Sequence, residues 1–314
     1  MFHFAKLGKV FDPVEYTCGS LSFAQMPTPL VLEEVIRVFF GTRTGPDAHG
    51  NYVSRTGFVD VDRKDPLRVR NVRLEPCLGP GDVGTFDEFG VIPFDIKRNG
   101  VEVTMHFAGY QRLGRTPYRV EIGRAESGDW GETFRRFSKG PTMHVGRKDP
   151  FFLTGPCIIR EGAQWRVFYS SGIGWINVNG RYESIYRLAS AVSEDMIDWK
   201  KDGEFLVGAR LTEECQARPW VVARDGLYHL WFSYRPARDF RNERNGYRVG
   251  YAWSEDLVNW YRDDARAGIG RSAAGWDSEM IAYTATAEVD GNLFLFYNGN
   301  QFGRYGFGVA QLVT

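Results

Sequence analysis

The sequence predicts an all-β fold, a five-bladed β-propeller with four-stranded antiparallel blades. The 314 residues include 36 Gly, 23 Phe, 15 Tyr and 9 Trp, which is typical of short strands joined by tight turns. The chain also repeats an apolar, aromatic strand that ends in a small or polar turn. Equivalent aromatic positions in its five copies lie 67, 62, 63 and 65 residues apart, at Phe40, Phe107, Tyr169, Phe232 and Tyr297. A fixed period of this kind indicates radially repeated blades.

Each repeat contains further short strands around the aromatic one. An apolar strand and a turn precede it, as at 156–159 and 219–222, and another strand follows it. In the third and fourth repeats the pattern Ser-x-Asp-x-x-x-Trp comes next, beginning at Ser193 and Ser254. Each unit therefore holds about four antiparallel strands. We expect the blades to span about 25–80, 81–140, 150–205, 213–265 and 276–314.

The two ends of the chain predict how the ring closes. Only four residues follow Ala310, so the fifth repeat lacks its outermost strand. Residues 1–24 precede the first blade, and we expect the strand at Phe4–Phe11 to supply the missing one. This pairing would cover edges that otherwise invite aggregation. The whole chain, 1–314, would then be one domain.

Charge and composition exclude several classes of protein. Lys plus Arg and Asp plus Glu both number 39, so the basic excess of a nucleic-acid-binding protein is absent from the sequence. No apolar run approaches the ~20 residues that span a bilayer. The first residues lack the apolar stretch of a secretory signal, so we expect a cytoplasmic location. Cysteines and histidines show no metal-ligand spacing, and no metal site is expected from them.

Several stretches resemble known propeller families. Ser-Glu-Asp-Leu-Val-Asn-Trp at 254–260 resembles the outer-strand pattern of five-bladed propeller glycosidases, the arabinanase, levansucrase and invertase superfamily that includes glycoside hydrolase families 43 and 32. The stretches 84–91, 214–220 and 275–280 with 297–300 resemble propeller proteins of surface-polysaccharide gene clusters. The resemblance covers essentially the full chain. It implies the fold, a carbohydrate-active enzyme and, by analogy with some members, room for a calcium ion in the channel; no other cofactor is expected.

The chain departs from the superfamily pattern at positions that matter for catalysis. The first blade opens on Gln-Met-Pro-Thr-Pro at 25–29, without an acid. Arg-Lys-Asp-Pro at 147–150 is similar to the invertase Arg-Asp-Pro motif except for an inserted lysine, whereas Glu214-Cys215 is similar to its Glu-Cys pair. The carboxylate triad of the superfamily therefore does not transfer directly.

The second repeat also resembles another propeller family. Residues 127–134 are similar to the Asp-box of sialidases, with Phe134 in place of the usual Trp. Five repeats count against a six-bladed sialidase. Arg43, Arg218 and Arg235 keep the comparison open, because sialidases carry three arginines.

The candidate catalytic residues are acids that precede innermost strands, because such positions face the central funnel of a propeller. Glycoside cleavage needs one carboxyl group as acid and another as base or nucleophile. We interpret Asp87, Glu214 and Asp277 as the reactive set, with Glu279 as a close alternative. In the competing interpretation, Asp87 and Asp277 hold turns by accepting backbone N–H bonds.

The candidate substrate-binding residues lie beside those acids. A guanidinium group presents a planar fork to carboxylate or phosphate, so Arg43, Arg218 and Arg235 facing inward would indicate an anionic sugar. Aromatic rings can stack on a sugar face, and an amide can hydrogen-bond its hydroxyls. These candidates are Tyr110, Trp175, Tyr283 and Asn298. The competing interpretations are blade packing for the rings and structural ion pairs for the arginines.

These observations lead to one hypothesis and two alternatives. The hypothesis is a glycoside hydrolase that acts on a carbohydrate or sugar-containing small molecule by carboxylate acid/base catalysis in the funnel. The alternatives are a propeller glycosyltransferase of lipopolysaccharide or polysaccharide synthesis and a non-catalytic sugar-binding propeller. The polar segment 238–245 is expected to form either a solvated hairpin or a lid at the funnel rim.

Overall fold

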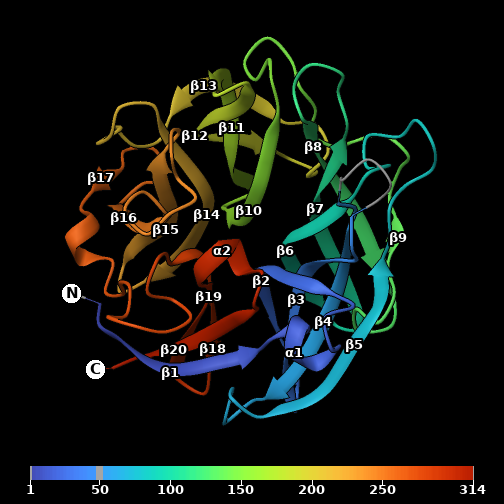
Figure 1. The fold of residues 1–314 in the computed structure, drawn as a ribbon, viewed down its shortest axis with the longest axis vertical. Coiled ribbons are helices and arrows are strands. Elements are labelled where there is room, and N and C mark those ends of the chain that lie inside the picture. The colour runs from blue at the N-terminus through green and yellow to red at the C-terminus, as the bar shows by residue number, and fades with distance from the viewer. Residues whose placement is uncertain (1, 47–51, 314) are drawn as a thin grey trace.

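The computed structural model describes residues 2–46 and 52–313, which form five four-stranded antiparallel sheets arranged around a centre (Figure 1). Each sheet is a blade. In the first four, the strands follow one another in chain order from the innermost outward. The predicted fold class is confirmed.

The first three blades have the following strands. Blade 1 contains β2 (Ser22–Val31), β3 (Val35–Arg43), β4 (Ser54–Asp62) and β5 (Val69–Leu78). Blade 2 contains β6 (Val91–Asn99), β7 (Glu102–Gln111), β8 (Arg119–Ser127) and β9 (Arg135–Arg136). Blade 3 contains β10 (Leu153–Glu161), β11 (Gln164–Val178), β12 (Arg181–Ser193) and β13 (Lys200–Phe205).

The last two blades and the short helices complete the chain. Blade 4 contains β14 (Glu214–Arg224), β15 (Leu227–Pro236), β16 (Arg248–Ser254) and β17 (Tyr261–Arg262). Blade 5 contains β18 (Ala282–Val289), β19 (Asn292–Asn298), β20 (Phe307–Leu312) and β1 (Phe4–Phe11). The helices are α1 (Pro13–Tyr16), α2 (Asn300–Gly303) and the 3₁₀ turn η1 (Asp264–Arg266). Within the described ranges, no helix combines the length and apolar character needed to cross a bilayer.

The ring closes as predicted, by pairing of the two chain ends. Strand β1 runs antiparallel to β20, with Phe4 opposite Leu312 and Phe11 opposite Phe307. In Figure 1 the blue N-terminal strand lies beside the red C-terminal strands. The edge of β20 is thereby hydrogen-bonded instead of open.

Packing explains why the aromatic residue recurs in each blade. All five aromatic residues are buried on the second strand, and the residue opposite on the third strand is small. A Cβ atom added to Gly123 would lie 2.4 Å from the ring of Phe107, and one added to Gly250 would lie 2.4 Å from the ring of Phe232. The rings therefore lie directly over these glycines, which explains why aromatic residues and glycines recur together.

The Ser-x-Asp patterns form outer turns. The Asp195 carboxylate accepts hydrogen bonds from Ser193 Oγ and from two backbone N–H groups, and Asp256 does the same beside Ser254. These backbone hydrogen bonds hold the pKa of Asp256 well below its ordinary value. Both aspartates thus stabilise turns at the periphery.

Candidate functional site

A cavity of about 620 Å³ occupies the centre of the ring at one face. It is lined by the beginnings of innermost strands, the ends of second strands and nearby loops, and all five blades contribute. We call it the central pocket; its lining includes Gln25, Arg43, Tyr110, Arg218, Arg235 and Tyr283.

The central pocket is basic and aromatic, although the chain as a whole has no net charge. Six arginines and seven tyrosines line it, against a single carboxylate among the described lining residues, Glu183. The arginines are Arg43, Arg112, Arg181, Arg218, Arg235 and Arg241. Such a concave, apolar-walled and positively charged site favours anionic ligands.

Arg43 stands at the end of β3 with neutral partners. Its Nη2 donates to Gln25 Oε1 at 2.6 Å and its Nε donates to Ser54 Oγ at 3.1 Å. The guanidinium lies 4.5 Å from the ring centroid of Phe23. Burial lowers the pKa of Arg43. No described carboxylate pairs with it, so its charge is available to a ligand.

Arg218 lies deeper, on β14, and is 1% exposed. Its guanidinium donates to the carbonyl oxygens of Phe94 and Pro27 and to Thr28 Oγ1, at 2.9 to 3.2 Å. Burial lowers the pKa of Arg218 to about 10. A buried charge without a carboxylate is costly, since hydrogen bonds to neutral groups compensate only part of its lost hydration.

Arg235, at the end of β15, is clamped among aromatic rings. Its Nη2 donates to the Tyr186 hydroxyl at 3.0 Å, and its guanidinium lies 3.4 Å from the ring centroid of Phe240. The Tyr186 hydroxyl also shares a short hydrogen bond with that of Tyr247. These contacts fix both the cation and the phenols, so the wall of the pocket is preorganised.

Glu183 is already engaged in ion pairs. Arg241 donates to both of its carboxylate oxygens, at 2.7 and 3.2 Å, and Arg181 lies at 3.3 Å. Arg241 belongs to the segment 237–247, whose Phe240 is buried against the pocket. Of the two expectations for 238–245, which lies within this segment, the lid fits better, because Phe240 and Arg241 line the pocket and Arg241 pairs with Glu183.

The predicted reactive acids lie elsewhere. Asp87, Glu214 and Asp277 are buried, and none of them lines the central pocket. Each pairs with a cation on the outermost strand of its own blade: Asp87 with Arg136 at 2.6 Å, Glu214 with Arg262 at 2.6 Å and Asp277 with Lys6. In blade 3, Asp149 pairs with Lys201 in the same way, at 2.8 Å. Each of these carboxylates therefore links the entry to the innermost strand with the outermost strand of the same blade.

Glu214 illustrates how fully these acids are engaged. Oε1 accepts from Arg262 and Gln216, and Oε2 accepts from the backbone N–H groups of Arg210 and Leu211. Burial by itself would raise the pKa of Glu214, but these hydrogen bonds outweigh it and hold the pKa below its ordinary value. The expectation that Glu214 faces the funnel is not met, and its catalytic role stays a prediction that the geometry does not support.

Three further predicted residues lie outside the lining of the central pocket. Trp175 packs behind it, with its ring centroid 5.1 Å from that of Tyr118. The buried amide of Asn298 accepts from Met26 N–H and donates to the carbonyls of Ala24 and Gly306, so it positions β2. Glu279 does not line the pocket either. By contrast, the central pocket is lined by Arg43, Tyr110, Arg218, Arg235 and Tyr283, whose role in substrate binding stays a prediction.

The residues around the central pocket do not fit the calcium ion that the family resemblance allows. Calcium takes six to eight oxygen ligands, usually with several carboxylates. The one described carboxylate of the lining is paired with two arginines, and the pocket carries excess positive charge. Among the described residues, no group of three or more His, Cys, Asp or Glu side chains could hold a metal ion.

Comparisons with known proteins agree with this fold. No protein-family model matches the chain. Structurally, it is similar to a glycoside hydrolase (TM-score 0.76, 17% identity, 98% of this chain and 91% of that one). It is also similar to a thermostable family-43 glycoside hydrolase (TM-score 0.63, 14% identity, 93% and 88%) and to the GH43_1 enzyme from Xanthomonas citri (TM-score 0.61, 13% identity, 98% and 90%).

These likenesses at low identity establish a shared propeller fold. A sequence relative is closer. The chain is 32% identical over 309 residues to "Uncharacterized protein Rv1502" of Mycobacterium tuberculosis (strain ATCC 25618 / H37Rv), and the match covers 98% of both chains. The chain therefore belongs to the family of Rv1502, with the five-bladed fold that family-43 glycoside hydrolases also have.

Proposed function

We propose that this protein binds a sugar carrying a carboxylate or phosphate in the central pocket and hydrolyses its glycosidic bond. The observation that carries the proposal is the convergence of Arg43, Arg218 and Arg235, without described carboxylate partners, on one aromatic-walled cavity. Guanidinium groups bind such anions through paired N–H donors, and aromatic rings stack on sugar faces. The fold shared with known glycoside hydrolases supports a sugar as the ligand, and the arginines support a negative charge on that sugar.

Within this proposal, Glu183 is the carboxylate that would take part in chemistry. Its ion pairs with Arg241 and Arg181 favour a role as base or nucleophile over a role as proton donor. Phenol hydroxyls of the same lining are the candidate proton donors. Burial raises the pKa of Tyr110, Tyr186 and Tyr283, so these hydroxyls stay protonated at neutral pH.

A second candidate function is sugar binding without turnover. It is favoured by the engagement of Asp87, Glu214 and Asp277 in structural ion pairs, which leaves the central pocket without the carboxylate pair that most glycosidases use. The two candidates share the ligand and differ only in the reaction.

The binding test compares galacturonic acid with galactose by isothermal titration calorimetry. We expect the acid to bind, galactose to bind at least about tenfold more weakly, and Arg43→Gln to remove the difference, because a charge-assisted hydrogen bond contributes about 1.5–3 kcal/mol. Arg135→Gln, an exposed arginine on β9 outside the lining of the central pocket, is the control. Equal affinity for the two sugars would contradict the proposal.

The reaction test measures reducing ends released from acidic oligosaccharides. We expect wild-type turnover and its loss in Glu183→Gln, with galacturonic acid binding at least as tightly as in the wild type, because the substitution removes a negative charge from the pocket. Binding without release by the wild type, across acidic oligosaccharides of several linkages, would favour the second candidate.

A further inference from the structure

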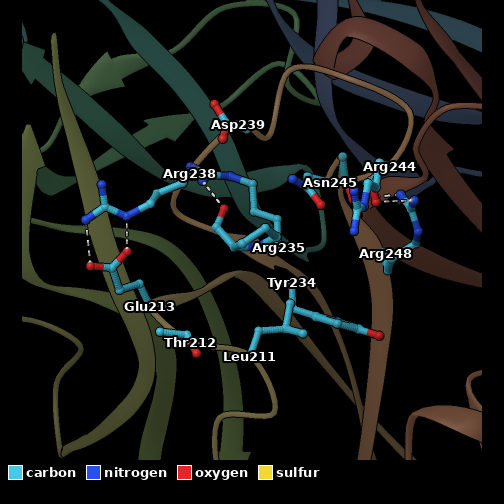
Figure 2. Close-up of a pocket in the computed structure, with 12 residues that line it drawn as sticks. Leu211, Thr212, Glu213, Tyr234, Arg235, Arg238, Asp239, Arg244, Asn245 and Arg248 are labelled. Atoms are coloured by element: carbon cyan, nitrogen blue, oxygen red, sulfur yellow. Dashed lines mark hydrogen bonds and ion pairs between the residues drawn. The ribbon is translucent and has the colours of Figure 1, made fainter. Parts of the chain in front are cut away.

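A second cavity of about 520 Å³ lies at blade 4 (Figure 2), and its lining shares Arg235 with that of the central pocket. It lies between the loop before β14, the end of β15, the segment 237–247 and the start of β16. We call it the rim pocket; its lining includes Leu211, Glu213, Arg235, Arg238, Arg244 and Arg248. Because the start of an innermost strand and the end of a second strand also border the central pocket, both cavities belong to the same end of the propeller.

The rim pocket also carries excess positive charge. Four arginines line it, against Glu213 and Asp239. Glu213 and Arg238 form a bidentate pair, at 2.7 and 3.1 Å, which Figure 2 shows at one side of the cavity. This pair cancels one positive charge. The remaining cations are Arg244 and Arg248 on the opposite wall and Arg235 between the two cavities.

On the opposite wall, Arg248 and Arg244 lie side by side (Figure 2). The guanidinium of Arg248 donates to five main-chain carbonyls, including those of Gly246 at 2.7 Å and Glu279 at 3.1 Å, and pairs with no described carboxylate. Its charge is thus fixed in place. Arg244 is exposed, and its guanidinium pairs with no carboxylate in the described part of the chain. Its N–H donors are therefore available.

The partition between the two cavities is Arg235, which lines both. It is 5% exposed, and its Nη1 and Nη2 donate to Pro236 O and the Tyr186 hydroxyl. Its Nε is buried and has no hydrogen-bond partner among the described residues. A buried donor left unpaired is costly, so the hydrogen bonds of the protein do not fully compensate the buried charge of Arg235.

We propose that the rim pocket is a second anion subsite, so that the ligand is an acidic oligosaccharide with negative charges on more than one sugar. One charge lies with Arg43 and Arg218 in the central pocket, and another with Arg244 and Arg248 in the rim pocket, while Arg235 contacts the chain between them. This inference rests on the proposed function, because it extends the same ligand outward from the central pocket.

The test is calorimetric titration with galacturonic acid, its dimer and its trimer, and with galactotriose as the neutral probe. We expect the dimer or trimer to bind at least about tenfold more tightly than the monomer, which corresponds to about 1.4 kcal/mol. Arg244→Gln should remove this gain and leave monomer binding unchanged, and Arg244→Glu should weaken the oligomer further. Arg244 is exposed, so both variants should fold. Arg135→Gln should keep the gain.

The outcomes separate the two proposals. If the monomer binds in an Arg43-dependent way but the oligomers gain nothing, or keep their gain in Arg244→Gln, the rim subsite is overturned and the proposed function stands. A similar gain for galactotriose over galactose would also overturn the subsite, because charge would then play no part. If no acidic sugar binds, the proposed function fails and the subsite fails with it.

Discussion

Arg262, on the outermost strand of blade 4, donates to Glu214, at the start of the innermost strand, at 2.6 Å. Asp87 with Arg136 and Asp149 with Lys201 repeat the relationship in blades 2 and 3. Each pair spans the width of a blade and is largely buried. A carboxylate in this position holds the outer strand, so its loss should affect folding before it affects ligand binding.

The substitution Glu214→Gln tests this structural role. It leaves the buried Arg262 without one of its two carboxylates, although Asp264 remains at 3.0 Å. Breaking a buried pair costs roughly 3–5 kcal/mol, and the remaining partner reduces this, so we expect the free energy of unfolding to fall by about 2–3 kcal/mol. Urea denaturation measures it. The matched control is Glu213→Gln, whose more exposed pair with Arg238 should contribute much less. Unchanged stability with lost activity would restore the catalytic interpretation.

The same pair predicts a pH dependence. The pKa of Glu214 is lower in the folded protein than its ordinary value of 4.5, so the unfolded chain binds the proton more readily. The stabilisation is therefore fully present above pH 4.5 and is lost as the pH falls through the lowered folded pKa. We expect the difference in unfolding free energy between wild type and Glu214→Gln to be constant from about pH 6 to 7 and to shrink below about pH 4. A difference that grows on acidification would contradict this assignment.

Gly250→Ala tests the packing rule of the repeat. The added Cβ would lie 2.4 Å from Cζ of Phe232, and the ring is fully buried, so something must shift. Overpacking of this kind costs roughly 1–3 kcal/mol, which thermal and urea unfolding would detect. Gly114→Ala, where nothing lies within 4 Å, should be neutral or slightly stabilising. Equal effects of the two substitutions would show that the ring does not constrain Gly250.

Some residues of the site could be predicted from the sequence, whereas others could be identified only in the folded structure. Arg43, Tyr110 and Arg235 were identified because they end second strands, and that position follows from the repeat alone. Glu183 was missed because β11 and β12 run on beyond the usual blade length, which brings their tip over the pocket. For the acids, the sequence did contain a signal of their structural role, which is a nearly constant spacing between acid and cation. Asp87 precedes Arg136 by 49 residues, and Glu214 precedes Arg262 by 48.

The sequence by itself determined the five blades, the strand that closes the ring and the position of the arginines near the funnel. These follow from a period of aromatic residues and glycines, since strand pairing within a blade is local in the chain. Only the tertiary structure decided which charges remain unpaired. An acid such as Glu214 and an arginine such as Arg218 lie four residues apart, yet one meets a cation from the outer strand and the other meets only neutral groups. Electrostatic pairing depends on contacts between distant segments, and the linear pattern does not contain them.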